Sequence, residues 1–365
     1  MHVGYSVIFQ GSDDPGQDGT VYEDDIALAV QAETLGYDSV WSVEHHFTSY
    51  TMCPDPLTML SYLAGRTTRV QLGSMVVVLP WHDPIRVAEQ AVMLDTMSGG
   101  RLILGLGRGL GRVEFGGFRV PMEESRGRFT ESAEFLIGAL ETGTAEYDGE
   151  FVKQPLRHLR PAPSRSFAGR IYASSVSPES WPIMAKLGIG IMIVPQKPWE
   201  TVVEELDGYR KLFLEVNGTE APPPIVACWT FVDEDEDRAR ELGRKYLQGY
   251  YETVLSHYEF TAGHLANTKG YEHYAGIARS LEKHGPAGHL DFFAELQVYG
   301  TPAQCVDKIT RIQQMTGAET FISVGRYAGM PADEARRNQQ LFADQVMPMI
   351  RHLSPEPVFT RMATA

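Results

Sequence analysis

Short apolar runs alternate with longer amphipathic segments along most of this chain. Eight runs have the length and β-branched or aromatic character of strands, at 3–9, 39–43, 70–79, 102–106, 171–173, 191–194, 225–232 and 318–324. Apolar residues recur at helical spacing between and after them, at 24–35, 56–64, 84–97, 123–140, 178–187, 199–216, 233–248, 302–315 and 332–349. This alternation predicts βαβ units with a parallel sheet, and eight units favour a closed (β/α)8 barrel over an open doubly wound sheet.

Two stretches interrupt the alternation, and we expect them to be insertions after strands four and seven. Residues 147–170 contain a Tyr-Asp-Gly-Glu turn and several prolines, which indicate a hairpin and a loop. Residues 251–297 carry five histidines without a clear periodicity, and they are too long for an ordinary connection. We expect this second stretch to be a mobile lid on a single domain that spans residues 1–365.

Charge and targeting signals narrow the class of protein. The 365 residues include 47 acidic and 32 basic side chains, for a net charge of −15, which argues against nucleic acid and anionic membranes as partners. The three cysteines lie far apart, at positions 53, 228 and 305, as expected in a reducing compartment. No signal peptide and no apolar run of membrane-spanning length is apparent, so the sequence predicts a cytoplasmic protein.

Candidate functional residues follow the predicted strands, where the active sites of such barrels lie. Glu44, His45 and His46 follow the second strand. Neighbouring side chains of an extended segment point to opposite faces, so the two histidines do not easily share one metal ion. No HExxH or HxH spacing supplies a further ligand, and we predict no metal site. A structural role and an acid/base or cofactor-contact role both stay open for the histidines.

A second group of residues suggests a phosphate pocket. Arg108 lies in the glycine-rich run 105–111 after strand four, which is not a GxGxxG dinucleotide fingerprint. Ser174 and Ser175 follow strand five at the start of a helix, either as an anion site or as an ordinary N-cap. Because strands four and five are neighbours, Arg108 and the serines are predicted to meet. The alternative to a phosphate pocket is a tight turn with Arg108 on the surface. The apolar run 73–78, at the end of strand three, could support the ring system of a ligand or belong only to the core.

Seven segments, in order along the chain, resemble the bacterial luciferase-like family of flavin-dependent monooxygenases, with the luciferase α subunit as its type. They are EHHFT at 44–48, GSMVVVLP at 73–80 with HDPIRVAE at 82–89, LDTMSGGR at 94–101, RGL at 108–110, MEESR at 122–126, GTPAQC at 300–305 and QVMP at 345–348. The resemblance implies the luciferase-like (β/α)8 barrel.

The resemblance also implies roles for individual residues. His45 corresponds to the active-site histidine, and Met75 and Val76 to a pair joined by a non-prolyl cis peptide under the flavin ring. The cofactor contacts that it implies are Glu44, Met75, Val76, Arg108, Leu110, Ser174 and Ser175. Three departures argue against light emission but not against flavin binding, because Gly107, Ser174 and Pro178 replace a reactive cysteine, a glutamate and a threonine.

The implied activity is oxygenation of a small organic substrate by reduced FMN and O2 through a flavin hydroperoxide. Since no dinucleotide fingerprint is present, we expect a separate flavin reductase to supply the reduced FMN. Family members commonly form dimers, so a homodimer is expected. Two alternatives remain. One is a deazaflavin-dependent hydride-transfer enzyme on the same barrel. The other is a non-catalytic flavin-binding or luciferase β-like subunit, and the presence of both His45 and Arg108 argues against this second alternative.

Overall fold

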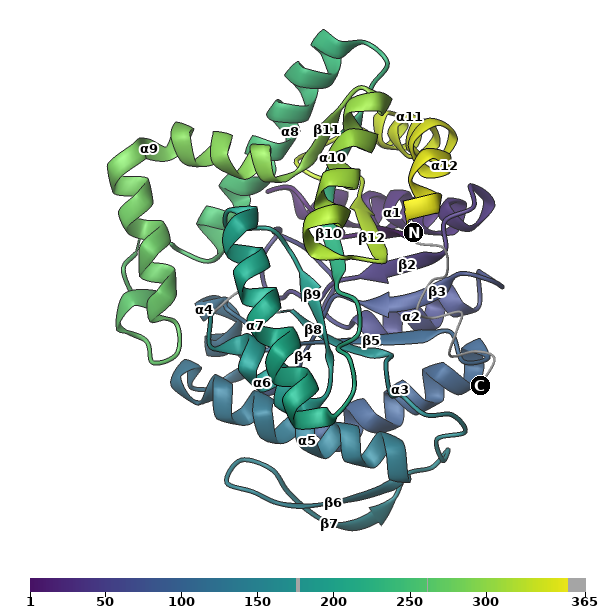
Figure 1. Cartoon of the computed structure of the whole chain (residues 1–365), viewed down its shortest axis with the longest axis vertical. Helices are drawn as coiled ribbons and strands as arrows, with labels where there is room; N and C mark the ends of the chain where they lie inside the picture. Colours follow the sequence, from purple (N-terminus) through teal and green to yellow (C-terminus); the bar gives the residue numbers. More distant parts are fainter. Residues whose placement is uncertain (175–177, 261, 354–365) are drawn as a thin grey trace.

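The computed structural model describes residues 1–174, 178–260 and 262–353. Its centre is a closed ring of eight parallel strands, each paired with the next and the last paired with the first (Figure 1). In ring order the strands are β1 (His2–Val7), β2 (Ser39–Ser42), β3 (Gln71–Ser74), β5 (Leu102–Gly107), β8 (Ile171–Ser174), β9 (Gly190–Ile193), β10 (Ile225–Val232) and β12 (Thr320–Val324). The closed ring confirms the predicted (β/α)8 barrel, and all eight predicted strands are present.

Helices follow the strands and cover the outside of the ring. They are α1 (Asp18–Thr34), α2 (Pro56–Ala64), α3 (Pro84–Ser98), α5 (Ser125–Thr142), α6 (Ser180–Leu187), α7 (Trp199–Asn217), α8 (Glu236–His257), α10 (Pro302–Thr316), α11 (Ala332–Leu341) and α12 (Met347–Ile350). Local chemistry starts several of them, since the side chains of Asp55 and Asp83 accept hydrogen bonds from backbone N–H groups at the starts of α2 and α3. In the described part of the chain, no helix is long and apolar enough to span a membrane.

Several predicted elements differ from the structure at their ends or in their middle. The predicted strand 70–79 is interrupted after Ser74 by a cis peptide bond between Met75 and Val76, and β4 (Val77–Val78) then pairs with β5. The first helix begins at Asp18, ahead of the predicted start at residue 24. The last predicted helix is divided by a π-helical turn at Phe342–Val346.

The first insertion is the predicted hairpin, and the second has more regular structure than its sequence suggested. Strands β6 (Thr144–Asp148) and β7 (Lys153–His158) pair antiparallel beside α5 (Figure 1). Within 251–297, however, α8 continues to His257 and α9 occupies Ala275–Leu296, with a bend at Gly285. Aromatic side chains of these helices are buried against each other, a tertiary contact that helical periodicity of aliphatic residues does not reveal. The short helix α4 (Arg112–Phe118) and strand β11 (Val298–Gly300) were not predicted either.

The interior of the barrel is filled by side chains around Trp41, which is fully buried. Two glycines on the neighbouring strands make room for its indole ring. A Cβ atom on Gly73 would lie 2.1 Å from Cε3 of Trp41, and one on Gly4 would lie 2.6 Å from Nε1. Any larger residue at these positions would push the tryptophan out of the barrel.

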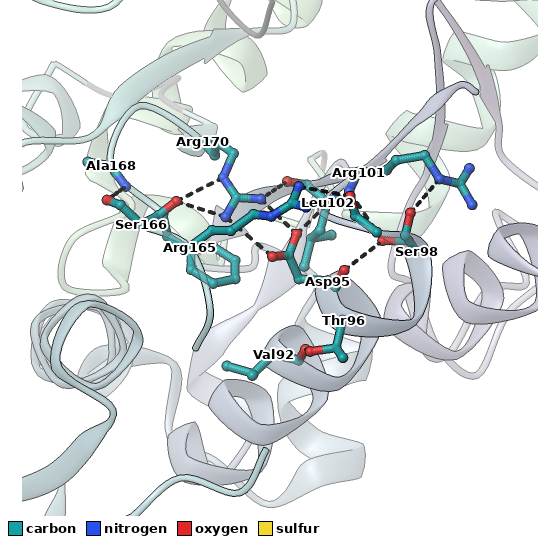
Figure 2. Close-up of polar contacts among 12 residues, drawn as sticks. Val92, Asp95, Thr96, Ser98, Arg101, Leu102, Arg165, Ser166, Ala168 and Arg170 are labelled. Atoms are coloured by element: carbon teal, nitrogen blue, oxygen red, sulfur yellow. Dashed lines mark hydrogen bonds and ion pairs between the residues drawn. The ribbon is translucent and has the colours of Figure 1, made fainter. Parts of the chain in front are cut away.

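The end of the barrel where the strands begin is tied together by charged side chains (Figure 2). The guanidinium of Arg170 donates to the carboxylate of Asp95 over 2.7 Å, and these side chains are 10% and 5% exposed. Arg101 donates to the backbone carbonyls of Ala64, Thr67 and Val70 over 2.9–3.2 Å. These bonds join the ends of α2 and α3 to the starts of the neighbouring strands.

Candidate active site

A cavity of about 1460 Å³, counted with its open mouth, lies at the ends of the barrel strands. Seven of the residues singled out in the sequence line it: Glu44, His45, Met75, Val76, Arg108, Leu110 and Ser174. Strands β5 and β8 pair directly, so Arg108, directly after β5, and Ser174, the last residue of β8, lie at the ends of adjacent strands as predicted. Ser175 lies outside the described residues.

His45 is held by a carboxylate that the sequence had not indicated. Its Nδ1 lies 2.9 Å from Oε1 of Glu114, a fully buried residue of α4. The same Oε1 accepts a 3.0 Å hydrogen bond from the backbone N–H of His46. His257, at the end of α8, approaches Glu114 from the other side, with 3.6 Å between Nε2 and Oε2. Its Nδ1 is 2.9 Å from the hydroxyl of Thr48. His45 therefore has a fixed ring orientation.

The electrostatics of this trio favour an ionised carboxylate. Burial alone would favour the neutral acid, but the electrostatic interaction with His45 and the contact with His257 outweigh it and lower the pKa of Glu114 to about 2. For His257, burial is the largest effect, and its pKa is lowered. One donor atom from each of the three residues lies within 4.8 Å of the others, so they could ligate a metal ion, a set that the sequence did not suggest.

Glu44 and His46 form a separate network that faces away from His45. The carboxylate of Glu44 accepts hydrogen bonds from His46 (3.1 Å), His82 (2.7 Å) and the backbone N–H of Val78 (2.8 Å). Burial opposes ionisation of Glu44, but these hydrogen bonds prevail and lower its pKa. The two adjacent histidines thus have different partners, as the extended backbone predicted. Since both oxygens of Glu44 bind groups within the protein, this residue positions the segment after the cis peptide.

The cis peptide and the glycine-rich strand form one closely packed wall of the cavity. A Cβ atom on Gly107 would lie 2.2 Å from Cγ2 of Val76, so only glycine permits this approach. Met75, Val76 and Gly107 all line the cavity. The wall is apolar and lacks a side chain at its glycine, features that suit the flat ring of a flavin.

Two arginines that line the same cavity converge on one oxygen atom. Nη1 of Arg108 and Nη2 of Arg126 donate to the backbone carbonyl of Gly270, over 2.8 and 3.2 Å. The guanidinium of Arg108 also lies 4.1 Å from the ring centre of Tyr271, whose hydroxyl donates to the carbonyl of Gly109 over 2.8 Å. The carbonyl oxygen marks a point where an anionic oxygen would be held by two guanidinium groups. Arg126 stands in the MEESR segment, but its side chain had not been singled out.

Comparison with known proteins identifies the family. The sequence profile of the luciferase-like monooxygenases matches residues 1–319, and the chain belongs to this family. It is 29% identical over 331 residues to the alkanal monooxygenase alpha chain of Aliivibrio fischeri, covering 87% of this chain and 90% of that one. The predicted resemblance is thereby confirmed.

Solved structures share the whole barrel. The monooxygenase RslO1 from Streptomyces bottropensis superposes with a TM-score of 0.76 at 26% identity, covering 95% of this chain and 99% of that one. The oxygenating constituent of 3,6-diketocamphane monooxygenase from Pseudomonas putida, solved with FMN, has a TM-score of 0.70 at 18% identity and coverages of 95% and 98%. The F420-dependent tetrahydromethanopterin reductase of Methanopyrus kandleri has a TM-score of 0.65 at 19% identity, with coverages of 95% and 98%. The fold therefore accommodates both FMN and a deazaflavin.

Proposed function

We propose that this protein is a monooxygenase that uses reduced FMN and O2 to oxygenate a small organic substrate. When bound, reduced FMN would supply two electrons, so that one oxygen atom enters the product and the other leaves as water. The observation that carries this proposal is the convergence on one oxygen of Arg108 and Arg126, which line the cavity together with His45. Paired guanidinium groups of this kind recognise a phosphate monoester, which FMN has and riboflavin lacks.

Different residues of the chain would bind the phosphate and the ring of FMN. Arg108, Arg126 and Ser174 would hold the phosphate, and Met75 and Val76 would support the ring. Ser175, which the sequence predicts to take part in the same phosphate pocket, lies outside the described residues. Leu110 lines the cavity beside Arg108 and adds apolar surface.

His45 is the residue that we assign to proton transfer. Its side chain is 19% exposed and lines the cavity, so it can reach a bound molecule. Nδ1 of His45 donates a hydrogen bond to the carboxylate of Glu114. Nε2 of His45 is therefore the atom that can donate a proton to the reacting groups or accept one from them.

The protein partners and the cellular location of this protein are each proposed from a single observation. A separate reductase would supply reduced FMN, because no dinucleotide fingerprint is present. Three exposed apolar residues on the adjacent helices α2 and α3, namely Tyr62 (48%), Met93 (45%) and Met97 (57%), support a homodimer. The three cysteines are free and buried, in keeping with the expected cytoplasmic location.

The segment between α8 and α9 is proposed to act as the lid. Gly270 and Tyr271 contact the arginine pair and the glycine-rich loop, so the segment covers the phosphate end of the cavity. Entry of FMN would require these contacts to open. Limited proteolysis should therefore cut first within 251–297, and FMN with substrate should slow the cleavage. First cleavage elsewhere, at a rate that ligands leave unchanged, would count against a lid.

Cofactor binding tests the proposed function directly. Wild-type protein should bind FMN more tightly than riboflavin or coenzyme F420. Arg108→Ala should weaken FMN binding about tenfold or more, since charge-assisted hydrogen bonds contribute about 1.5–3 kcal/mol each. Arg157→Ala, at an exposed position on β7, is the matched control and should leave affinity unchanged. Equal affinity for FMN and riboflavin would refute the phosphate site, and preference for F420 would favour deazaflavin-dependent hydride transfer.

A further inference from the structure

One wall of the cavity consists of aromatic rings from the second insertion and the strand beside it. The residues that line the cavity there are Trp229 on β10, Tyr250 and Tyr251 on α8, Tyr258 directly after α8, and Phe293 on α9. Each of them except Tyr258 is more than nine-tenths buried. This wall, called the aromatic wall below, is absent from the roles that the family resemblance implied.

The rings of the aromatic wall are stacked on each other at small angles. Tyr251 and Phe293 have ring centres 4.4 Å apart and planes 15° apart. Trp229 and Tyr250 are 4.4 Å apart with planes 32° apart. Each ring packs against a neighbouring ring, so the wall is formed by contacts within the protein. A flat aromatic ligand gains stacking energy on such a surface, whereas a flexible alkyl chain must lose rotational freedom to lie against it.

A chain of tyrosine hydroxyls brings hydrogen-bonding capacity to the same wall. The hydroxyls of Tyr50 and Tyr250 are 2.6 Å apart, and the ring centre of Tyr258 lies 5.6 Å from that of Tyr50. Burial is the main cause that raises the pKa of Tyr50 to about 12, and it raises the pKa of the other two hydroxyls further, so all three keep their protons at neutral pH. The hydrogen bond between Tyr50 and Tyr250 uses one of their two hydroxyl protons, and the other is left to donate to an acceptor on a ligand.

The hydroxyl chain adjoins the residue proposed for proton transfer. The ring centre of Tyr50 lies 4.8 Å from that of His45, and Tyr50 stacks on His257 at 4.5 Å. A ligand oxygen bound by Tyr50 would therefore lie on the His45 side of the cavity. The aromatic wall and the hydroxyl chain together favour binding of a flat ligand that has a hydrogen-bond-accepting oxygen at one edge.

Building on the function proposed above, we propose that the substrate is a planar aromatic molecule with a carbonyl or phenolic oxygen. Its ring packs on the aromatic wall and its oxygen accepts a hydrogen bond from the hydroxyl chain of Tyr50. A straight-chain aldehyde of similar size has the same acceptor oxygen but no ring to pack on the aromatic wall.

Two aldehydes of similar size separate these possibilities. We would measure the affinity of the full-length protein, with and without FMN, for 2-naphthaldehyde, decanal and 2-methylnaphthalene by calorimetry. The naphthaldehyde should bind about tenfold more tightly than decanal, because stacking on two or three rings adds to burial. It should also bind about threefold to tenfold more tightly than 2-methylnaphthalene, which lacks the acceptor oxygen. Decanal binding as tightly as the naphthaldehyde would overturn the proposal.

Variants test whether the aromatic wall causes the preference for 2-naphthaldehyde over decanal. Tyr251→Leu should remove most of the preference for 2-naphthaldehyde over decanal, and Tyr251→Phe should keep it because the ring remains. Tyr50→Phe should bring the affinities for 2-naphthaldehyde and 2-methylnaphthalene close together. Tyr246→Leu is the matched control, since this buried tyrosine of α8 does not line the cavity, and it should keep the preference. An unchanged preference in folded Tyr251→Leu would also refute the proposal.

These experiments distinguish a failure of the proposed substrate class from a failure of the proposed FMN-dependent function. Protein that selects the naphthaldehyde but binds no FMN would refute the cofactor and leave the substrate class intact. Protein that binds FMN through Arg108 but prefers decanal would refute the substrate class alone.

Discussion

The two ends of the barrel treat their polar groups differently. Where the strands begin, the charged side chains are paired within the protein: Arg170 with Asp95 (Figure 2), and Arg101 with three backbone carbonyls. Where the strands end, several buried polar atoms of the cavity lining have no hydrogen-bond partner among the described residues. They are Oγ1 of Thr51, Nε1 of Trp81, Oε2 of Glu114 and Nε1 of Trp229.

An unpaired buried polar atom costs free energy, commonly about 1–3 kcal/mol. The first end avoids this cost for its paired charged groups and has such an atom in Oε1 of Gln71 at the start of β3, whereas the second end accepts the cost at several positions around the cavity. This is the division expected if one end maintains the fold and the other interacts with cofactor and substrate. Changes at the first end should reduce stability with little effect on the chemistry, and changes at the second end should do the reverse.

The largest effect is expected at His45. His45→Ala should fold and bind FMN, but its rate of product formation should fall by about 10²–10⁴, because a proton-transferring group is lost. Reduced FMN should then be consumed with release of hydrogen peroxide. The neighbouring His46, which packs against the rings of Trp81 and Phe118, supplies the control. His46→Ala should lower stability by about 1–3 kcal/mol and keep most of the activity per folded molecule.

The measurement for both histidine variants is product formed per reduced FMN consumed, alongside urea unfolding. If His45→Ala retains the wild-type ratio, the assignment of this histidine is wrong.

The next largest effect is expected at the opposite end, in the buried ion pair. Asp95→Asn leaves the guanidinium of Arg170 buried without its counter-charge, and should lower the free energy of unfolding by about 3–5 kcal/mol. Activity per folded molecule should not change. Asp148→Asn, which breaks an exposed pair with Lys153, should cost well under 1 kcal/mol. Urea unfolding of both variants checks the comparison, and similar losses would contradict it.

A smaller effect should make stability depend on pH at the same end. Burial lowers the pKa of His2 to about 4, whereas an unfolded histidine has a pKa of about 6.5. Between these values the unfolded chain binds more protons, so this contribution is complete above about pH 6.5 and is lost as the pH falls to about 4. The loss amounts to about 3 kcal/mol at most.

His2→Gln should therefore lose less stability than wild type between pH 7 and pH 4.5, as measured by urea unfolding at several pH values. Parallel pH dependences in the two proteins would show that His2 is not the group responsible.

The smallest effect is expected at Arg165, which belongs to the same cluster as Arg170 but is exposed (Figure 2). Its guanidinium donates to the carbonyl of Gly99 over 2.8 Å, a bond that water can replace. Arg165→Ala should change the free energy of unfolding by about 0.5 kcal/mol or less. A loss comparable to that of Asp95→Asn would mean that exposure does not separate the two arginines.

The sequence by itself determined the parts of this protein that depend on neighbours along the chain. Apolar runs and helical periodicity are local, and they predicted the eight strands of the barrel. Strand order then placed Arg108 and Ser174 after adjacent strands, and the structure confirms that both line the cavity. The extended backbone at His45 and His46 was enough to give the two rings different partners.

Only the tertiary structure decided which distant residues meet these. Glu114 lies 69 residues from His45, and Gly270 lies 162 residues from Arg108, so no local pattern links either pair. The helices α8 and α9 likewise owe their positions to stacked aromatic rings, whose partners come from another helix or from β10. Such contacts depend on how whole elements pack in space, because side chains far apart in the chain become neighbours only after the barrel has closed.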